Sequence, residues 1–278
     1  MFDVSRMRLF AMLSLSLFLN LTSLAHAADP FDQSHKGFTD ILTNHVRWNA
    51  AGTASSVDYA GLKADHTALD RYTASLSGVS QAQFQKFNKL ERRAFLINAY
   101  NAFTLQLILT KYPDLKSIKD LGSFFSSPWK KAFVALLGQT RSLDDIEHVL
   151  LRGADDYDDP RIHFAVNCAS IGCPALRPEA FVAARLDAQL LDQTQRFLRD
   201  RSRNRFNVEA KTLELSMIFK WYGGDFERGF LGANSVAEFV ASYASSLGLS
   251  AAQLAALKAG EIGIDYTDYS WQLNKIAL

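Results

Sequence analysis

The stretch Ala94–Leu109, AFLINAYNAFTLQLIL, is apolar almost all the way round a helix. It belongs to a longer helical pattern, which begins after Ser80 as a possible N-cap and ends before Pro113. A break near Asn88 would divide this pattern into two helices. Because a helix without a polar face must be covered on all sides, we predict that this one lies at the centre of the fold.

Two amide side chains, Asn98 and Asn101, interrupt the apolar helix. With Glu91 and Ala94 they follow spacings of three, four and three residues, which place them on one helix face. A buried amide needs hydrogen-bond partners. These polar residues therefore either hold a neighbouring loop by hydrogen bonds, which is the preferred interpretation, or form the wall of a site.

The rest of the chain predicts shorter elements around this helix. Helical patterns cover Phe38–Trp48, Asp65–Leu76, the segment after Ser142, Pro178–Asp200, and the segments after Ser235 and Ser250. After Ser142 the predicted buried stripe is Leu143, Ile146, Val149 and Leu150. Extended segments are predicted at Ala132–Leu136, Arg161–Asn167, Phe206–Val208 against Leu213–Leu215, and Ile262–Asn274. This order predicts an α+β fold, a helix-rich single domain with a few short antiparallel strands.

The N-terminus has the features of a secretory signal peptide. Arg6 and Arg8 precede a short apolar run, which ends at the small-residue site Ala25-His26-Ala27. The run is too short for a membrane span, which needs about 20 residues. We expect cleavage after Ala27 and a periplasmic or secreted protein without a membrane span. Residues 1–27 would be the signal peptide, 28–79 a helical extension packed on the core, and 80–278 the main domain.

The charge balance argues against recruitment of nucleic acid or anionic lipid. The chain has 30 basic and 29 acidic residues, and cleavage would leave 28 of each. The motifs of nucleotide-binding loops, zinc proteases and serine esterases are absent. We therefore predict no cofactor, no metal and no nucleic-acid partner. A small-molecule or peptide substrate and a protein partner remain open.

Both cysteines lie in one stretch, IHFAVNCASIGCPALRP, at residues 162–178. Cys168 and Cys173 form a catalytic site, a disulfide or a metal clip with His163. An exported protein favours the disulfide. The spacing H-x4-C-x4-C is not the usual zinc knuckle. If there is a nucleophile, it is Cys168, because the end of a core strand is a rigid platform.

A cysteine nucleophile needs a base and usually a group that orients the base. His163 is five residues from Cys168, and an odd separation on a strand points side chains to opposite faces. His148 is therefore preferred as the base, with His163 second. Glu91 is preferred to Glu147 as the orienting group. Backbone N–H groups around Ala169–Ser170 would stabilise an oxyanion. Proposed substrate-binding residues are Asn98, Asn101, Asn167 and Ser170.

Four stretches together resemble one family. They are ERRAFLINAYNAFTL (91–105), SLDDIEHVLLR (142–152), DPRIHFAVNCASIGCPALRPEAF (159–181) and IFKWYGGDF (218–226), and IDYTDYSWQLN (264–274) is similar to its terminal segment. The family is domain of unknown function 547, and the resemblance covers about residues 80–275. It implies an exported bacterial member. Family positions fall on Cys168, His148 and His163. With His before Cys, a papain-like cysteine hydrolase core would have to be circularly permuted.

Two functions from different classes follow from these residues. The first is an exported cysteine-dependent hydrolase or acyl transferase acting on amide or thioester bonds, in which Cys168 attacks and an imidazole moves the proton. The second is a non-catalytic binding domain, in which Cys168–Cys173 is a disulfide and the aromatic run Phe219–Tyr222 packs or contacts a partner.

Overall fold

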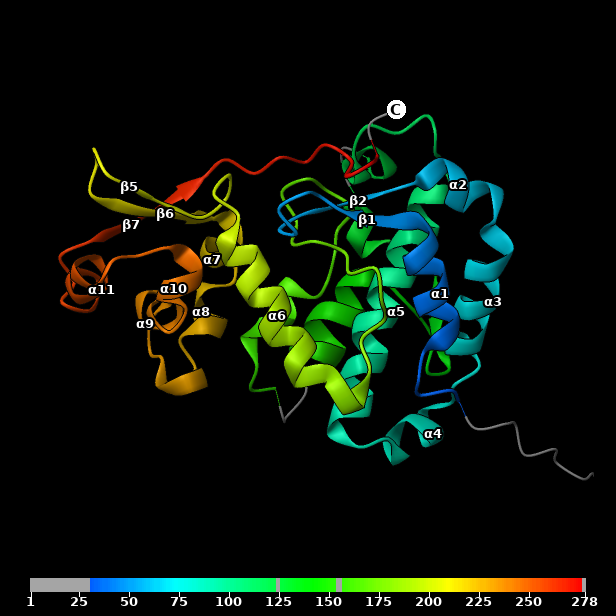
Figure 1. Cartoon of the computed structure of the whole chain (residues 1–278). Helices are drawn as coiled ribbons and strands as arrows, with labels where there is room; N and C mark the ends of the chain where they lie inside the picture. The colour runs from blue at the N-terminus through cyan, green and yellow to red at the C-terminus, as the bar shows by residue number, and fades with distance from the viewer. Residues whose placement is uncertain (1–30, 124–125, 154–156, 277–278) are drawn as a thin grey trace, which may run out of the picture. The chain divides into compact units, whose positions relative to one another are not determined.

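A computed structural model describes residues 31–123, 126–153 and 157–276. The predicted signal peptide lies outside the described residues. The described residues cluster as one unit. The α+β prediction is confirmed, since helices predominate and the strands form three small sheets (Figure 1).

The α-helices are α1 (Lys36–His45), α2 (Tyr59–Ala64), α3 (His66–Ser77), α4 (Gln81–Lys86), α5 (Lys89–Leu109), α6 (Leu186–Arg199), α7 (Met217–Trp221), α8 (Gly223–Phe226), α9 (Val236–Ala241), α10 (Ala244–Leu247) and α11 (Ala251–Lys258). Short 3-10 or π-helical segments are η1 (Ile118–Leu121), η2 (Pro128–Lys130), η3 (Asp145–Leu151), η4 (Pro160–Phe164), η5 (Ala183–Arg185) and η6 (Phe230–Gly232).

The strands pair mainly as antiparallel hairpins. β1 (Val46–Trp48) pairs with β2 (Ser55–Val57), and β3 (Val134–Leu136) pairs with β4 (Gln139–Arg141). In the third sheet β5 (Arg205–Asn207) pairs antiparallel with β6 (Thr212–Ser216), in the predicted hairpin, with Phe206 opposite Leu213. β7 (Gly263–Thr267) adds parallel to β6, which the expectation of antiparallel strands did not include.

Helix α5 is the central helix that the sequence predicts (Figure 1). The expected break occurs at Asn88, whose side chain accepts from the Glu91 N–H while the Glu91 carboxylate accepts from the Asn88 N–H. This capping box starts a new helix after α4. From Ala94 to Leu105 every residue of α5 is buried.

The N-terminal helices share one apolar core with α5. Phe38 of α1 stacks on Tyr72 of α3 with ring centroids 4.7 Å apart, and Phe31 meets Phe95 of α5 at 5.2 Å. All four belong to or pack against the same core cluster. Residues 31–79 are therefore part of the packing around α5.

A second apolar core lies in the C-terminal part and is centred on the rings of Phe219, Phe226 and Phe239. Segment η4 joins the two cores. Its Ile162 belongs to the first cluster and its Phe164 to the second. Groups carried by η4 are thus fixed from both sides by packed side chains.

The prediction of a strand over Arg161–Asn167 is wrong, because Pro160–Phe164 forms the 3-10 helix η4. Asp159 caps this helix by accepting from the Arg161 N–H, and Pro160 occupies its first turn, where its fixed φ favours helix. The segment is buried on all sides. A short apolar run that is buried all round has the same hydrophobic pattern as a strand or as a helix.

The helix after Ser142 also departs from its prediction. Its segment Asp145–Leu151 is π-helical, not α-helical. A π-helix has more residues per turn than an α-helix, so different side chains face the core. Val149, which was predicted to be buried, is 57% exposed, and Glu147 is buried instead. The π-helical register therefore turns a carboxylate inward.

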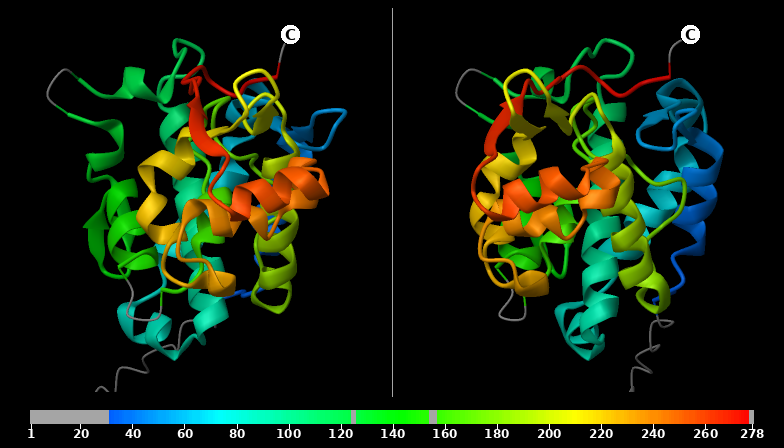
Figure 2. Two further views of the ribbon diagram at one scale, coloured as in Figure 1. Left: turned by 90° about the vertical axis from the view of Figure 1, so that its left-hand side faces the viewer. Right: turned by 60° about the vertical axis from the view of Figure 1, so that its left-hand side comes forward.

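After β7, residues 268–276 form a strap over the cysteine loop, which is residues 168–173. The Ile171 N–H donates to the Gln272 carbonyl at 2.8 Å, and the Asn274 N–H donates to the Ala169 carbonyl at 3.1 Å. The strap then reaches β2, where the Val57 N–H donates to the Asn274 carbonyl. Figure 2 shows this red terminal segment running along one end of the described unit.

Candidate functional site

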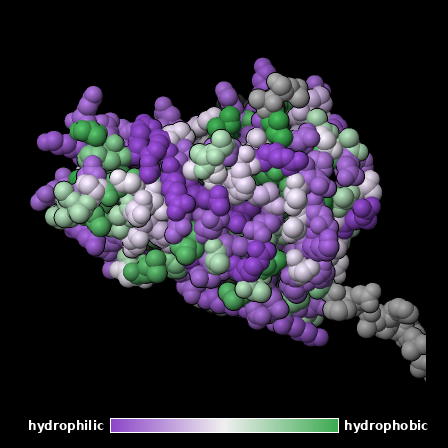
Figure 3. Space-filling model, in the orientation of Figure 1, coloured by the Kyte–Doolittle hydropathy of each residue, from purple (hydrophilic) through white to green (hydrophobic). Residues whose placement is uncertain are grey.

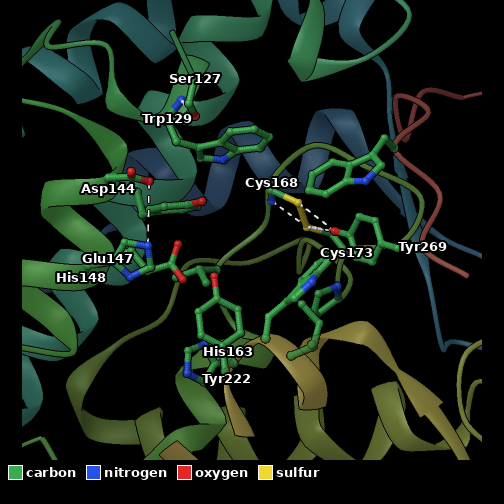
Figure 4. A pocket seen from close by; sticks show the side chains of 16 residues that line it. Ser127, Trp129, Asp144, Glu147, His148, His163, Cys168, Cys173, Tyr222 and Tyr269 are labelled. Carbon is green, nitrogen blue, oxygen red and sulfur yellow. Dashed lines mark hydrogen bonds and ion pairs between the residues drawn. A yellow bond between two sulfur atoms is a disulfide. The ribbon is translucent and has the colours of Figure 1, made fainter. Parts of the chain in front are cut away.

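The candidate site is a pocket of about 160 Å³, partly open to solvent, next to η4. Its wall combines acidic, aromatic and sulfur-containing side chains from segments far apart in the sequence (Figure 4). The lining residues are Tyr100, Ser127, Trp129, Asp144, Glu147, His148, His163, Val166, Cys168, Cys173, Pro174, Ile218, Trp221, Tyr222, Tyr269 and Trp271.

Cys168 and Cys173 form a disulfide in the pocket wall, with sulfurs 2.10 Å apart. The Cys168 N–H donates to the Cys173 Sγ at 2.9 Å. The Tyr269 hydroxyl lies 3.0 Å from the Cys168 Sγ and donates to the Cys173 Sγ at 3.2 Å. The predicted disulfide is therefore present. A nucleophilic Cys168 would first require reduction of this disulfide.

Asparagine side chains hold the backbone of the cysteine loop. Asn101 accepts from the Asn167 N–H at 2.8 Å and donates to the Ala165 carbonyl. Asn167 accepts from the Ala169 N–H and donates to the Pro174 carbonyl. The Ala169 N–H is thus occupied, and Ala169 has a left-handed φ of 60°. An oxyanion hole that uses this N–H is not available in the structure.

The other proposed substrate-binding residues are also placed behind the pocket. Asn98 exchanges two hydrogen bonds with the Phe181 backbone, at 2.7 and 2.9 Å. The Ser170 hydroxyl donates to the Cys168 carbonyl. Asn98, Asn101, Asn167 and Ser170 are not among the lining residues. The preferred interpretation of Asn98 and Asn101 as loop anchors is confirmed, and the roles of the four residues in substrate binding stay a prediction.

His163 is the buried imidazole of the pocket. Its Nε2 lies 2.8 Å from the Asp225 Oδ2, and its ring stacks on Tyr222 with centroids 4.0 Å apart. Burial lowers the pKa of His163, against the raising effect of the Asp225 carboxylate. Its Nδ1 is buried and has no hydrogen-bond partner. A neutral imidazole with one unused nitrogen can accept or pass a proton.

Asp225 anchors the groups behind the pocket. Its carboxylate also accepts from the Arg152 Nε at 2.6 Å and from the Tyr157 hydroxyl at 3.2 Å, and Arg228 lies at 3.3 Å. These donors and His163 hold the pKa of Asp225 well below its usual range, although burial opposes them. Asp225 therefore stays ionised and fixes the ring of His163.

His148, the preferred base, faces other partners. Its Nδ1 is 2.8 Å from an Arg152 guanidinium nitrogen, and its Nε2 is 3.8 Å from the Asp144 carboxylate. Because a guanidinium is only a donor, Nδ1 must accept, and the proton is on Nε2. His148 and His163 line the same pocket as Cys168. No described hydrogen bond joins either ring to a sulfur.

Glu147 replaces Glu91 as the carboxylate of the site. Glu91 is used by its capping box and lines a different pocket, so it does not orient an imidazole. Glu147 is 5% exposed and interacts with the Tyr222 hydroxyl. Burial and this carboxylate raise the pKa of Tyr222. Asp144 completes an acidic end of the pocket, and burial raises its pKa.

Aromatic rings from three distant segments form the other walls. Trp129, Trp221 and Trp271 are three of the four tryptophans of the chain, and all three line the pocket. The rings of Trp221 and Trp271 stack at 5.7 Å, and Tyr269 lies 4.5 Å from Trp271. Trp221 and Trp271 lie in stretches that carry the family resemblance, but the convergence of the three rings was not predicted, because each ring alone resembles a core residue.

Within the described ranges, no cluster of three or more His, Cys, Asp or Glu residues could hold a metal ion. None of the described helices is long and apolar enough to cross a membrane. On the face shown in Figure 3, hydrophobic residues lie in small separate groups among hydrophilic ones.

Comparison with known proteins gives one relationship. Residues 84–198 match the model of the family described as "Protein of unknown function, DUF547". The matched segment contains α5, η3, η4 and the disulfide, and the match agrees with the resemblance seen in the sequence. No curated protein and no solved structure matches the chain. The permuted papain-like core therefore stays a prediction.

Proposed function

We propose that the protein binds a small molecule or a peptide side chain in the aromatic pocket. The convergence of Trp129, Trp221 and Trp271 on one cavity is the observation that supports this function. Trp221 is 44% exposed, in a molecule whose two cores bury most large apolar side chains. Rings that are exposed and preorganised bind a ligand at a small entropic cost.

The acidic end of the pocket indicates the charge of the ligand. Glu147 and Asp144 line it, and no lysine or arginine is among the described lining residues. Aromatic faces and carboxylates together attract an ammonium group. We therefore expect a ligand with an amine or a quaternary ammonium group, held between the carboxylates and the indole rings.

Choline and its uncharged isostere 3,3-dimethyl-1-butanol test this function. We expect choline to shift the NMR signals of the indole N–H groups of Trp129, Trp221 and Trp271, while Trp48, which lies outside the pocket, serves as an internal control. The isostere should bind at least about tenfold more weakly, and Glu147→Gln should remove the difference. Equal binding of the two probes would contradict the charge preference. Absence of any pocket shift with both would contradict the binding function.

A cysteine-dependent hydrolase or acyl transferase is the second candidate function. The specific observation in its favour is that Cys168 is partly exposed in a pocket that His163, itself hydrogen-bonded to Asp225, also lines. The thiol exists only after reduction of the disulfide. We expect reduced protein to form an acyl adduct on Cys168 with a thioester probe, and Cys168→Ser to form none. Reduced protein that forms no adduct would exclude this candidate.

We further propose that the chain is exported, on the basis of the basic and apolar pattern of residues 1–27 and of the disulfide, which is typical of oxidising compartments. Mass spectrometry of the protein from a periplasmic fraction should give an N-terminus at Ala28. An intact Met1 in the cytoplasmic fraction would contradict export.

A further inference from the structure

The two residues of the disulfide differ in their exposure to solvent. Both line the pocket, but Cys173 is 5% exposed, whereas Cys168 is partly exposed. A thiolate that enters the pocket therefore reaches Cys168 more readily than Cys173. Access to one sulfur is one of the factors that decide the direction of thiol–disulfide exchange.

The groups around Cys173 suit a leaving thiolate. Its Sγ accepts from the Cys168 N–H at 2.9 Å and from the Tyr269 hydroxyl at 3.2 Å, and this hydroxyl also lies 3.0 Å from the Cys168 Sγ. Hydrogen bonds to a charged acceptor are stronger than those to a neutral one. The contacts therefore strengthen as negative charge develops on Cys173, and a better stabilised leaving thiolate departs faster.

Two further features support this site. Burial raises the pKa of Tyr269, so its hydroxyl keeps the proton that it donates. The guanidinium of Arg203, paired with Asp200 at 2.7 Å, hydrogen-bonds to the Cys173 carbonyl and so fixes the backbone of the residue that carries the leaving sulfur. The strap carries Tyr269, and it packs against the cysteine loop at Gly172, where an added Cβ would meet the ring at 2.9 Å.

We propose that Cys168–Cys173 is a reactive disulfide that exchanges with thiols entering the pocket, with Cys168 as the attacked sulfur and Cys173 as the leaving group. An incoming thiolate R–S⁻ forms a bond to the Cys168 Sγ while the bond to Cys173 breaks, which gives a mixed disulfide R–S–S–Cys168 and a Cys173 thiolate. A second thiol then attacks the sulfur of R. The two thiols leave as a disulfide, and their two electrons remain on the reduced cysteine pair. The acidic end of the pocket selects uncharged or cationic thiols.

This activity goes beyond binding and does not depend on it. It also differs from the hydrolase candidate, because the electrophile is the sulfur of Cys168 rather than a substrate carbonyl. Reduction by this route would nevertheless supply the thiol that a hydrolase requires.

The position of the first adduct tests the proposal without a variant. Oxidised full-length protein is mixed under native conditions with 2-mercaptoethanol, quenched with N-ethylmaleimide and digested for mass spectrometry. We expect mercaptoethanol on Cys168 and maleimide on Cys173. An adduct on Cys173, or a disulfide that reacts only after unfolding in guanidinium, would overturn the proposal.

The rate of reaction tests the role of the tyrosine. Tyr269→Phe should slow native reduction by roughly tenfold, since a hydrogen bond to a charged group is lost. Tyr266→Phe, a nearby tyrosine not in contact with the sulfurs, should leave it unchanged, and all three proteins should react equally when unfolded. 2-Mercaptoethanesulfonate should react more slowly per thiolate than 2-mercaptoethanol. A Tyr269→Phe variant that reacts at the native rate would overturn the leaving-group assignment, and equal rates for the two thiols would overturn the charge selection. If Tyr269→Phe does not fold, the position of the adduct in the unchanged protein still decides.

Discussion

Asp225 is a buried carboxylate whose side chain is 2% exposed and which accepts hydrogen bonds from His163, Arg152 and Tyr157. Asp225→Asn keeps the shape but removes the charge, so the Arg152 guanidinium loses its counter-ion. We expect the free energy of unfolding, measured in urea, to fall by about 3 kcal/mol.

Asp187→Asn is the matched control for this prediction. Asp187 also pairs with an arginine, Arg161, at 2.6 Å, but its side chain is 81% exposed. An exposed pair contributes little, so we expect a loss below about 1 kcal/mol. Similar losses in the two variants would contradict the role of Asp225 as a buried anchor.

His35 predicts a dependence of stability on pH. Burial lowers its pKa from 6.5 to about 4, and its Nδ1 is 2.7 Å from the Tyr72 hydroxyl. Between pH 6.5 and 4 the unfolded chain therefore binds a proton that the folded protein does not bind, and stability falls as the pH is lowered. The slope is up to about 1.4 kcal/mol per pH unit for one such group, and His163, with its lowered pKa, adds to it.

Urea unfolding between pH 7 and 5 tests this prediction. His35→Phe keeps a ring in the cluster with Phe31. It should reduce the slope of the unfolding free energy against pH by the amount that corresponds to about one proton. His66→Gln changes a histidine whose side chain is 58% exposed and should leave the slope as it is. A His35→Phe slope equal to that of the unchanged protein would show that His35 is protonated in the folded state.

At the residue scale, the disulfide could be predicted from the sequence, but the hydrogen-bond partners of the histidines could not. The pairing of Cys168 with Cys173 follows from their even number and from the predicted export of the chain. The partners of His163 and His148 do not, because Asp225 and Arg152 reach them only through tertiary packing. The role of Glu91 could have been predicted locally. Asn88 lies three residues before it, and this spacing is that of a capping box, which the prediction of Glu91 as an orienting group overlooked.

At the scale of elements, caps and amphipathic periods predicted the helices well, including the break at Asn88 and the helices that follow Ser235 and Ser250. Segment η4 was mispredicted because it is buried between packed neighbours, so its hydrophobic pattern does not distinguish a strand from a helix. In η3 a helix was predicted correctly, but its π-helical spacing buries other residues than an α-helical period would bury.

The contact between the strap and the cysteine loop predicts the effect of a single methyl group. Gly172→Ala places a Cβ at 2.9 Å from the Tyr269 ring, so the ring or the loop must move. We expect a loss of about 1–3 kcal/mol in the free energy of unfolding, the usual effect of overpacking.

Gly224→Ala is the control for Gly172→Ala. Gly224 lies in α8 and has no atom within 4 Å of an added Cβ. Alanine restricts the unfolded chain and favours helix, so this variant should be unchanged or more stable by up to about 1 kcal/mol. Chemical denaturation compares the two variants. A stable Gly172→Ala protein would show that the strap yields without cost.

At the scale of the whole molecule, the class of fold was predictable from the alternation of helical and extended patterns, whereas the pocket was not. Its walls come from α5, η2, η3, the cysteine loop, α7 and the strap, which span residues 100 to 271. No local pattern encodes which of these segments meet, because their convergence depends on how the two apolar cores pack on η4.

The shared core around α5 predicts that residues 80–278 do not fold alone. Phe38, Leu42, Leu69 and Leu76 of α1 and α3 are at most 2% exposed and belong to the same cluster as α5. Burial of a large apolar side chain contributes about 1.5–3 kcal/mol. The loss of four such side chains approaches the entire stability of a typical domain, about 5–15 kcal/mol.

Expression of residues 80–278 and of residues 31–278 compares the two forms directly. We expect residues 31–278 to give a cooperative urea transition and a near-UV circular dichroism spectrum from packed aromatic rings, and residues 80–278 to give neither. The family match begins at Phe84, so a segment defined by sequence similarity would be incomplete as a folding unit. A cooperative transition for residues 80–278 would show instead that α1 and α3 pack on a core that is already formed without them.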